Sequence, residues 1–215
     1  MQSLDLIKKR IRSIEATKKI TNAMKLVATT KLRSQRKLFE AASAFCISYY
    51  DAFKLLVAKN GGLNQYKRKE NKDHSCLYIL ITSDLGLCGA YNSNICRYLA
   101  GQLKPQDKIL VFGQKGESWL KAHRFGKQII RTLHWNASEN TYYSLLPLGV
   151  EVVESYMQGK YEKIKLIFTS LVSSLKYKPT TWDLLPIDEN HYKTDNRILT
   201  ETTLYEPNVP HLLPL

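Results

Sequence analysis

The chain has 215 residues and a mass of 24.8 kDa, and its 32 Lys and Arg residues against 19 Asp and Glu residues give a formal charge of +13. With 44% hydrophobic and 24% charged residues, its composition is that of a globular protein, which excludes a disordered tail, a collagen and a disulfide scaffold. The first twenty residues lack an apolar centre and no apolar run is long enough to span a membrane, so neither secretion nor a membrane span is supported.

The first predicted element is one long helix. No Gly precedes Gly61 and no Pro precedes Pro105, and Ser3 followed by Asp5 resembles a helix start. A heptad pattern of apolar and small residues predicts a coiled-coil helix that runs from Ser3 to about Ala58 and is roughly 80 Å long. Such a helix cannot bury its apolar stripe against itself, so we expect it to pack against a partner along much of its length.

Charge and a second set of apolar residues distinguish this helix further. Residues 1–58 contain twelve Lys and Arg residues but four Asp and Glu residues, so most of the positive charge belongs to the helix. In its middle the apolar residues drift to a second or broader stripe that includes Ile20, Met24, Val27 and Leu38. The cationic face is either solvated or in contact with an acidic partner or a nucleic acid.

An α/β region follows the helix, which we place in residues 1–60. Residues 61–74 are polar and charged, which predicts a linker, and residues 75–206 alternate short apolar runs with amphipathic stretches. This alternation predicts a Rossmann-like, mostly parallel sheet with flanking helices. The expected strands are residues 76–82, 108–112, 127–130 and 163–169 with an antiparallel edge strand at 171–177, and the expected helices are residues 92–103, 114–123 and 142–157.

The sharpest local motif is SDLGLCGAYN at residues 83–92, between the first strand and the first helix of this region. A glycine-containing turn there can cradle a phosphate, but this one has neither GxGxxG nor GK[ST]. A structural turn is therefore favoured over a ligand site, with Asp84 as a cap and with Gly86 and Gly89 allowing close backbone approach. We expect Cys88 to be an inert thiol, because no His or acidic partner for it is identifiable.

The residue patterns indicate no catalytic, metal or cofactor site. The five histidines are dispersed singly, and the four cysteines form no CxxC pair and have no zinc spacing, which is typical of reduced thiols in a cytosolic compartment. We therefore predict no catalytic residue, no cofactor and no metal, and an enzyme acting alone is not supported. Nucleic-acid binding has the charge in its favour but lacks a recognition module.

Three segments, in the correct order, resemble the gamma subunit of F-type ATP synthases. Residues 14–36 (IEATKKITNAMKLVATTKLRSQR) are similar to the family's N-terminal helix, residues 83–92 to its SDxGLCGxxN segment, and residues 204–207 (LYEP) to its tyrosine-glutamate-proline stretch. The resemblance implies a non-catalytic rotor shaft that transmits rotation from a membrane ring to the catalytic subunits of a proton-translocating ATP synthase. The alternative is a basic coiled-coil protein that binds nucleic acid or serves as a scaffold.

The resemblance also implies partners and residue roles. The residues expected to contact the surrounding alpha and beta subunits are Met24, Lys25, Lys31, Arg33 and Arg36. Those expected to shape the strand-to-helix turn are Asp84, Gly86, Cys88 and Gly89. Tyr205 and Glu206 match a segment that the family uses against the ring of c subunits or the epsilon subunit. The chain would lie at the cytoplasmic face of a bacterial inner membrane, held there only through these partners, with no nucleic acid bound.

The end of the sequence departs from the family pattern. In the family a long C-terminal helix follows the tyrosine-glutamate-proline stretch, whereas residues 207–215 here are proline-rich where that helix would begin. We expect either a truncated chain or a naturally short gamma subunit, whose first helix lacks its usual helical partner.

Overall fold

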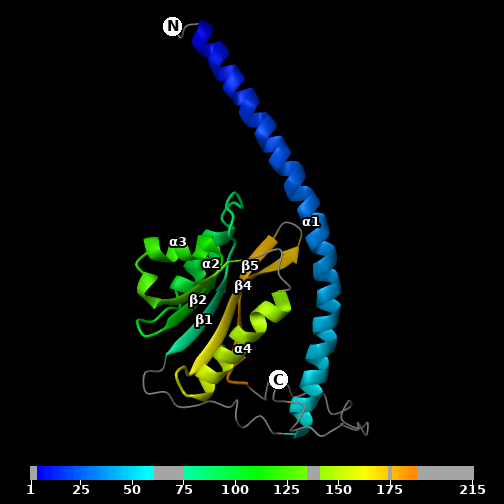
Figure 1. Ribbon diagram of the computed structural model, residues 1–215, viewed down its shortest axis with the longest axis vertical. Coiled ribbons are helices and arrows are strands. Elements are labelled where there is room, and N and C mark those ends of the chain that lie inside the picture. The colour runs from blue at the N-terminus through cyan, green and yellow to red at the C-terminus, as the bar shows by residue number, and fades with distance from the viewer. Residues whose placement is uncertain (1–3, 61–74, 135–140, 174–175, 188–215) are drawn as a thin grey trace. The chain divides into compact units, whose positions relative to one another are not determined.

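The structure, a computed structural model, describes residues 4–60, 75–134, 141–173 and 176–187 (Figure 1). The chain divides into two compact units, residues 1–56 and residues 57–215, and we describe each by itself. The first unit lies within helix α1 (Leu4–Asn60), which has 57 residues and confirms the predicted long helix. Asp5 in its first turn places a negative charge at the positive end of the helix dipole, which favours the helix start there.

The second unit is built on a five-stranded sheet. Its strands are β1 (Cys76–Ile81), β2 (Lys108–Phe112), β3 (Ile129–Leu133), β4 (Lys163–Ser173) and β5 (Lys176–Leu185). Their order across the sheet is β3-β2-β1-β4-β5. Strands β1 to β4 run parallel to one another, and β5 pairs antiparallel with β4. The helices are α2 (Tyr91–Ala100), α3 (Gln114–Ala122), the short 3-10 helix η2 (Gly126–Gln128) and α4 (Thr141–Met157).

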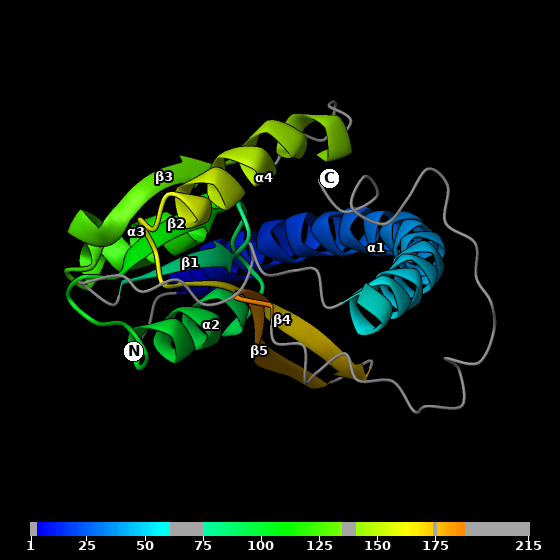
Figure 2. The same cartoon turned by 90° about the horizontal axis from the view of Figure 1, so that it is seen from below.

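Helices cover both faces of this sheet, so the sheet has two apolar cores. Successive side chains of a strand point to opposite faces, and β1 follows this rule. Tyr78 and Leu80 pack in a core with residues of α2 and α3, whereas Leu77 packs with residues of α4. Figure 2 shows α4 on one side of the sheet and α2 on the other. The arrangement confirms the predicted α/β class with a mostly parallel sheet and flanking helices.

Three of the predicted strands, those at 127–130, 163–169 and 171–177, are wrong in their limits. The strand expected at 127–130 is β3, which starts later because residues 126–128 form η2. The edge strand expected at 171–177 is β5, Lys176–Leu185, while residues up to Ser173 belong to β4. β5 contains Pro179, opposite Thr169, and an edge strand tolerates a proline because one side of it needs no ladder hydrogen bond.

Gly116 is expected to be essential for packing α3 on the sheet. A Cβ atom at Gly116 would lie 2.6 Å from the Thr82 hydroxyl oxygen and 3.1 Å from a methyl carbon of Val111. We expect Gly116→Ala to lower the free energy of unfolding by about 1–3 kcal/mol, the usual cost of overpacking. Urea unfolding followed by Trp fluorescence measures this, because all three Trp residues lie beyond residue 56.

Gly149 provides the matched control for this substitution. It lies in α4, and a Cβ atom there would meet nothing within 4 Å. Gly149→Ala should leave stability unchanged or raise it by about 0.5–1 kcal/mol, since Ala is the better helix former. Equal destabilisation by both substitutions would show that the close contact with Thr82 is not the cause.

Candidate functional site

Helix α1 exposes large apolar side chains along its whole described length. They include Leu4, Ile14, Met24, Leu38 and Tyr49, and the side chain of Met24 is 53% exposed. With 3.6 residues per turn, Ile20, Val27, Leu38 and Phe45 form a second stripe about a third of the circumference away from the heptad stripe. Soluble proteins rarely leave so much contiguous apolar surface open, so α1 is an interaction surface on more than one side.

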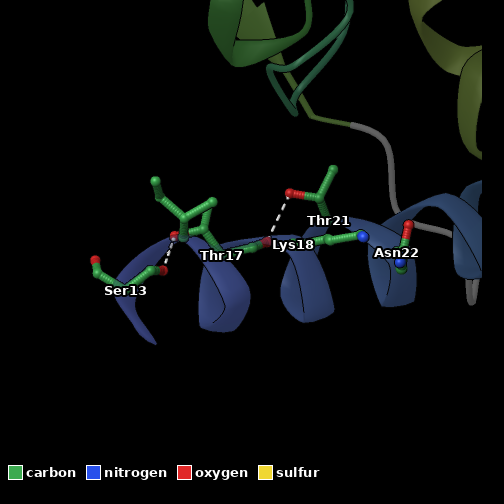
Figure 3. Close-up of a pocket in the computed structure, with 6 residues that line it drawn as sticks. Ser13, Thr17, Lys18, Thr21 and Asn22 are labelled. Atoms are coloured by element: carbon green, nitrogen blue, oxygen red, sulfur yellow. Dashed lines mark hydrogen bonds between the residues drawn. The ribbon is translucent and has the colours of Figure 1, made fainter. Parts of the chain in front are cut away.

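Several threonine hydroxyls on α1 donate to backbone carbonyls of the same helix. Thr17 Oγ1 donates to the Ser13 carbonyl at 2.9 Å and Thr21 Oγ1 donates to the Thr17 carbonyl at 2.9 Å, as Figure 3 shows. Thr29 Oγ1 bonds the Lys25 carbonyl in the same way. Because these protons are already used, the three hydroxyls have none left to donate to a partner.

A shallow, open hollow lies on this part of the α1 surface. Its lining residues are Ser13, Ile14, Thr17, Lys18, Thr21 and Asn22. All of these described residues belong to helix α1. A hollow of this kind fits a single side chain of a packed helix better than it fits a small-molecule ligand.

The cations expected to contact partner subunits are all exposed. Between Glu15 and Glu40 the sequence has seven Lys and Arg residues and no acidic residue. Arg36 Nε lies 3.0 Å from Glu40 Oε1, one turn along the helix, and both side chains are exposed. Within the described residues, Lys25 and Lys31 form no ion pair, so their charges are available to a partner.

The turn at residues 83–92 is closed by its own side chains. Asn92 Oδ1 accepts a hydrogen bond from the Ser83 backbone N–H at 3.1 Å. Asn92 Nδ2 donates to Ser83 Oγ at 2.8 Å and to Cys88 Sγ at 3.1 Å. Leu87, whose side chain is 93% exposed, and Gly89 both have positive φ, of 62° and 59°. The polar groups of the turn therefore bond each other.

The backbone N–H groups at the start of helix α3 also donate to acceptors within the chain. Asp84 Oδ1 accepts from the Gln114 N–H at 2.9 Å, and the Ser83 carbonyl accepts from the Lys115 N–H at 3.0 Å. The Gly116 N–H donates to Thr82 Oγ1 at 3.0 Å. The first three N–H groups of α3 thus have acceptors, and this helix terminus offers no anion site of the phosphate-binding kind.

The predicted roles of the turn glycines need correction. A Cβ at Gly86 would meet only the end of the flexible Lys115 side chain, at 3.4 Å, and a Cβ at Gly89 would meet nothing within 4 Å. The close approach expected there is wrong, and it occurs instead at Gly113 and Gly116, next to Thr82. The conformation of Gly89, rather than the space around it, requires glycine.

Asp84 is a cap, but for a helix thirty residues further along the chain. Its carboxylate bonds the first N–H of α3 and also lies 3.1 Å from His134 Nδ1. The sequence pattern did not indicate Thr82, Asn92 or His134 as hydrogen-bond partners of this turn. The asparagine that closes the SDLGLCGAYN motif was the one available signal, because an Asn side chain both donates and accepts near a turn.

The remaining expectations concern Tyr205 and Glu206, metal binding and membrane-spanning helices. Tyr205 and Glu206 lie outside the described residues. In the described part of the chain, no group of three or more His, Cys, Asp or Glu side chains is placed to hold a metal ion. None of the described helices combines the length and apolar character that crossing a membrane requires.

The four cysteines fall into two exposed and two buried thiols. Cys46 and Cys88 are exposed, and Cys76 and Cys96 are buried. Burial raises the pKa of the Cys76 thiol to about 12, with the nearby Asp107 carboxylate adding to the shift. Burial alone raises the pKa of the Cys96 thiol to about 12. The two core thiols are therefore unreactive apolar groups in the folded state.

Comparisons with known proteins identify relatives of the whole chain. The sequence model of the family described as ATP synthase matches residues 3–214. The ATP synthase gamma chain of Ureaplasma urealyticum serovar 10 is 32% identical over 216 residues, which cover 98% of this chain and 75% of that one. The ATP synthase gamma chain of Mycoplasma mobile is 32% identical over 212 residues, which cover 97% and 73% of the two chains.

A solved structure supports the fold. In the central stalk and c-ring of the Tetrahymena thermophila mitochondrial ATP synthase, one chain aligns with a TM-score of 0.66 and 24% identity, over 90% of this chain and 83% of that one. At this identity the similarity concerns the arrangement of helices and strands.

Removal of the Asp84 carboxylate should weaken the start of α3. We expect Asp84→Ala to cost about 1 kcal/mol, as for other lost N-terminal caps, and to speed hydrogen exchange at the Gln114 amide. Asp183→Ala is the control, because Asp183 pairs with Lys165 at 3.0 Å at the surface and should cost less than about 1 kcal/mol. An unchanged exchange rate at Gln114 would contradict the capping role.

The buried thiols should make stability depend on alkaline pH. Their pKa is higher in the folded than in the unfolded chain, so the contribution of these thiols to stability is constant below about pH 9 and falls as pH rises toward 12, by about 1.4 kcal/mol per pH unit for each thiol. Urea unfolding at about pH 8 and about pH 10 measures this. The Cys76→Val/Cys96→Val variant should lose less stability over the same interval, and an equal loss would refute the assignment.

Proposed function

Because this chain belongs to the family of ATP synthase gamma chains, the non-catalytic rotor subunits of F-type ATP synthases, we propose that α1 is its rotating shaft, enclosed by the alpha and beta subunits of the catalytic hexamer. The observation that carries this proposal is the continuous apolar and cationic surface of α1, exposed along the helix and arranged in two stripes. A helix of 57 residues with such a surface is stable only when partners cover it. Family membership also decides against the alternative of a nucleic-acid-binding or scaffold protein.

The chemistry of α1 suits a contact that has to slide. Hydroxyl groups bonded within the helix make no fixed hydrogen bond that rotation would break. Exposed ion pairs are weak, of about 0–1 kcal/mol each, and can be remade with a new partner after each step. In this proposal Met24, Lys25, Lys31, Arg33 and Arg36 contact the alpha and beta subunits.

The rest of the chain would couple this shaft to the membrane part of the enzyme. We place the shaft in residues 1–60, a linker in 61–74, the α/β domain in 75–206 and a proline-rich end in 207–215. The epsilon subunit and the ring of c subunits are the proposed partners of the α/β domain, with Tyr205 and Glu206 at that contact. The location that follows is the cytoplasmic face of a bacterial inner membrane.

Assembly of the full chain with its own alpha and beta subunits tests this function. We expect a complex whose ATP hydrolysis differs from that of alpha and beta alone, and whose dissociation constant rises with salt. In the Lys25→Gln/Lys31→Gln/Arg33→Gln variant, the loss of three exposed contacts should weaken assembly about tenfold and lower its salt dependence.

A charge-matched control distinguishes the loss of contacts made by α1 from a change in net charge. Lys104→Gln/Lys127→Gln/Lys163→Gln removes the same charge from the α/β unit, and it should assemble like the unmodified chain. Failure of the unmodified chain to assemble, or equal weakening by both triple variants, would overturn the proposed role of α1.

A further inference from the structure

One edge of the sheet carries pairs of cations on three successive connections. In parallel strands joined by helices, each chain segment that leads from a helix into the next strand lies at the end of the sheet where the strands begin. By the edge of the sheet we mean this row of strand starts, not an edge strand. The strand register places Lys163 beside Cys76 and Lys108 beside Leu77, so the starts of β4, β1 and β2 are aligned. The basic edge consists of Lys104, Lys108, Arg124, Lys127, Lys160 and Lys163.

Hydrogen bonds tie these connections into one surface. Gln128, which precedes β3, donates from Nε2 to the Lys104 carbonyl at 2.6 Å and to the Asp107 carbonyl at 3.1 Å. Ser75 precedes β1 and Lys160 precedes β4, and Ser75 Oγ donates to the Lys160 carbonyl at 3.1 Å. The Glu162 N–H in turn donates to the Ser75 carbonyl at 2.8 Å. The backbone below the cations is therefore fixed.

The acidic side chains among these connections are withdrawn from solvent. Asp107 is 1% exposed, and its two carboxylate oxygens accept from the backbone N–H groups of Cys76 and Lys104 at 2.9 and 2.8 Å. Glu162 is 6% exposed. Five of the six cations are exposed, Lys108 being half-buried. Among the described residues, Lys104, Lys108, Arg124, Lys127 and Lys163 form no ion pair, so the edge faces solvent with positive charge.

The residue types of the basic edge favour phosphate groups on a fluid surface. Five of its six cations are lysines, which bind phosphate as point charges and are depleted at protein interfaces, where Arg is enriched. Tyr161, the aromatic residue beside Lys160, is buried and offers no platform for stacking bases. Groups of four to eight Lys and Arg residues beside a membrane attract anionic lipids.

We propose that the basic edge binds an anionic phospholipid surface directly. This inference rests on the proposed function, since that function places the α/β unit in a membrane-bound enzyme. It goes beyond attachment through partner subunits alone. A lipid surface also suits a rotor, because its headgroups exchange freely and present similar charge at every angle of rotation.

Binding to vesicles tests the basic edge. The complex of the full chain with alpha and beta subunits is sedimented with vesicles of equal parts phosphatidylglycerol and phosphatidylcholine, so that α1 is covered. We expect salt-sensitive binding that is absent with phosphatidylcholine alone. Because each cation near such a surface contributes about fivefold, Lys104→Gln/Lys127→Gln/Lys163→Gln should weaken binding about a hundredfold.

The matched control is Lys115→Gln/Lys176→Gln/Lys178→Gln, which removes three exposed cations of the same unit outside the basic edge and should bind vesicles within about twofold of the unmodified complex. Trp fluorescence in urea checks that both variants fold. Equal loss by the two variants, no binding to anionic vesicles, or tighter binding to double-stranded DNA or polyglutamate than to the vesicles would overturn the proposal.

The assembly step separates the two proposals. If no complex with alpha and beta forms, the proposed function of α1 fails, and the same vesicle assay is made on the full chain alone. Lipid binding by the basic edge then stands if its triple variant loses at least tenfold more affinity than the Lys115→Gln/Lys176→Gln/Lys178→Gln variant, and falls if it does not.

Discussion

A single helix cannot bury an apolar stripe against itself, and this constraint governs the first unit. Isolated helices are marginal in water, and most helical stability in proteins comes from packing. Helix α1 has 57 residues and exposes apolar side chains on more than one side. Its stability is therefore linked to whatever encloses it, and the binding energy of partners is also folding energy. A subunit of this kind is structurally complete only within its assembly.

The second unit is organised in the opposite way, because it buries its own apolar side chains and bonds the N–H groups at the start of α3 internally. Alternating side chains of β1 enter two separate cores, and the N–H groups at the start of α3 bond Asp84, the Ser83 carbonyl and Thr82. The fold class and the turn motif both suggest a phosphate site at first sight. In this turn the side chains of Ser83, Asp84 and Asn92 instead bond groups of the chain itself.

Local sequence patterns predicted most of the helices and strands, but they did not indicate which residues far apart in the sequence bond each other. The helix from Ser3 was predictable from its apolar period and lack of Gly and Pro, and β1 and β2 from their apolar runs. Strand β3 was misplaced because its exposed Arg131 interrupts the apolar pattern. The predicted edge strand ended at Tyr177 because Pro179 reads as a strand breaker, although an edge strand tolerates it. The bond from Asp84 to Gln114 joins residues thirty positions apart, so no local spacing indicates it.

The distribution of charge shows most clearly what the sheet topology reveals beyond the sequence. Counting residues assigns the excess of cations to the helix, and the remainder looks dispersed because Lys104, Lys127 and Lys163 are far apart in the sequence. Parallel strands bring these residues to one edge, while Asp107 is buried to hold the connections together. Both cationic surfaces consist mainly of exposed side chains. Weak, screened contacts of this type change little in energy as a rotor turns, whereas one strong buried ion pair would hold it at a single angle.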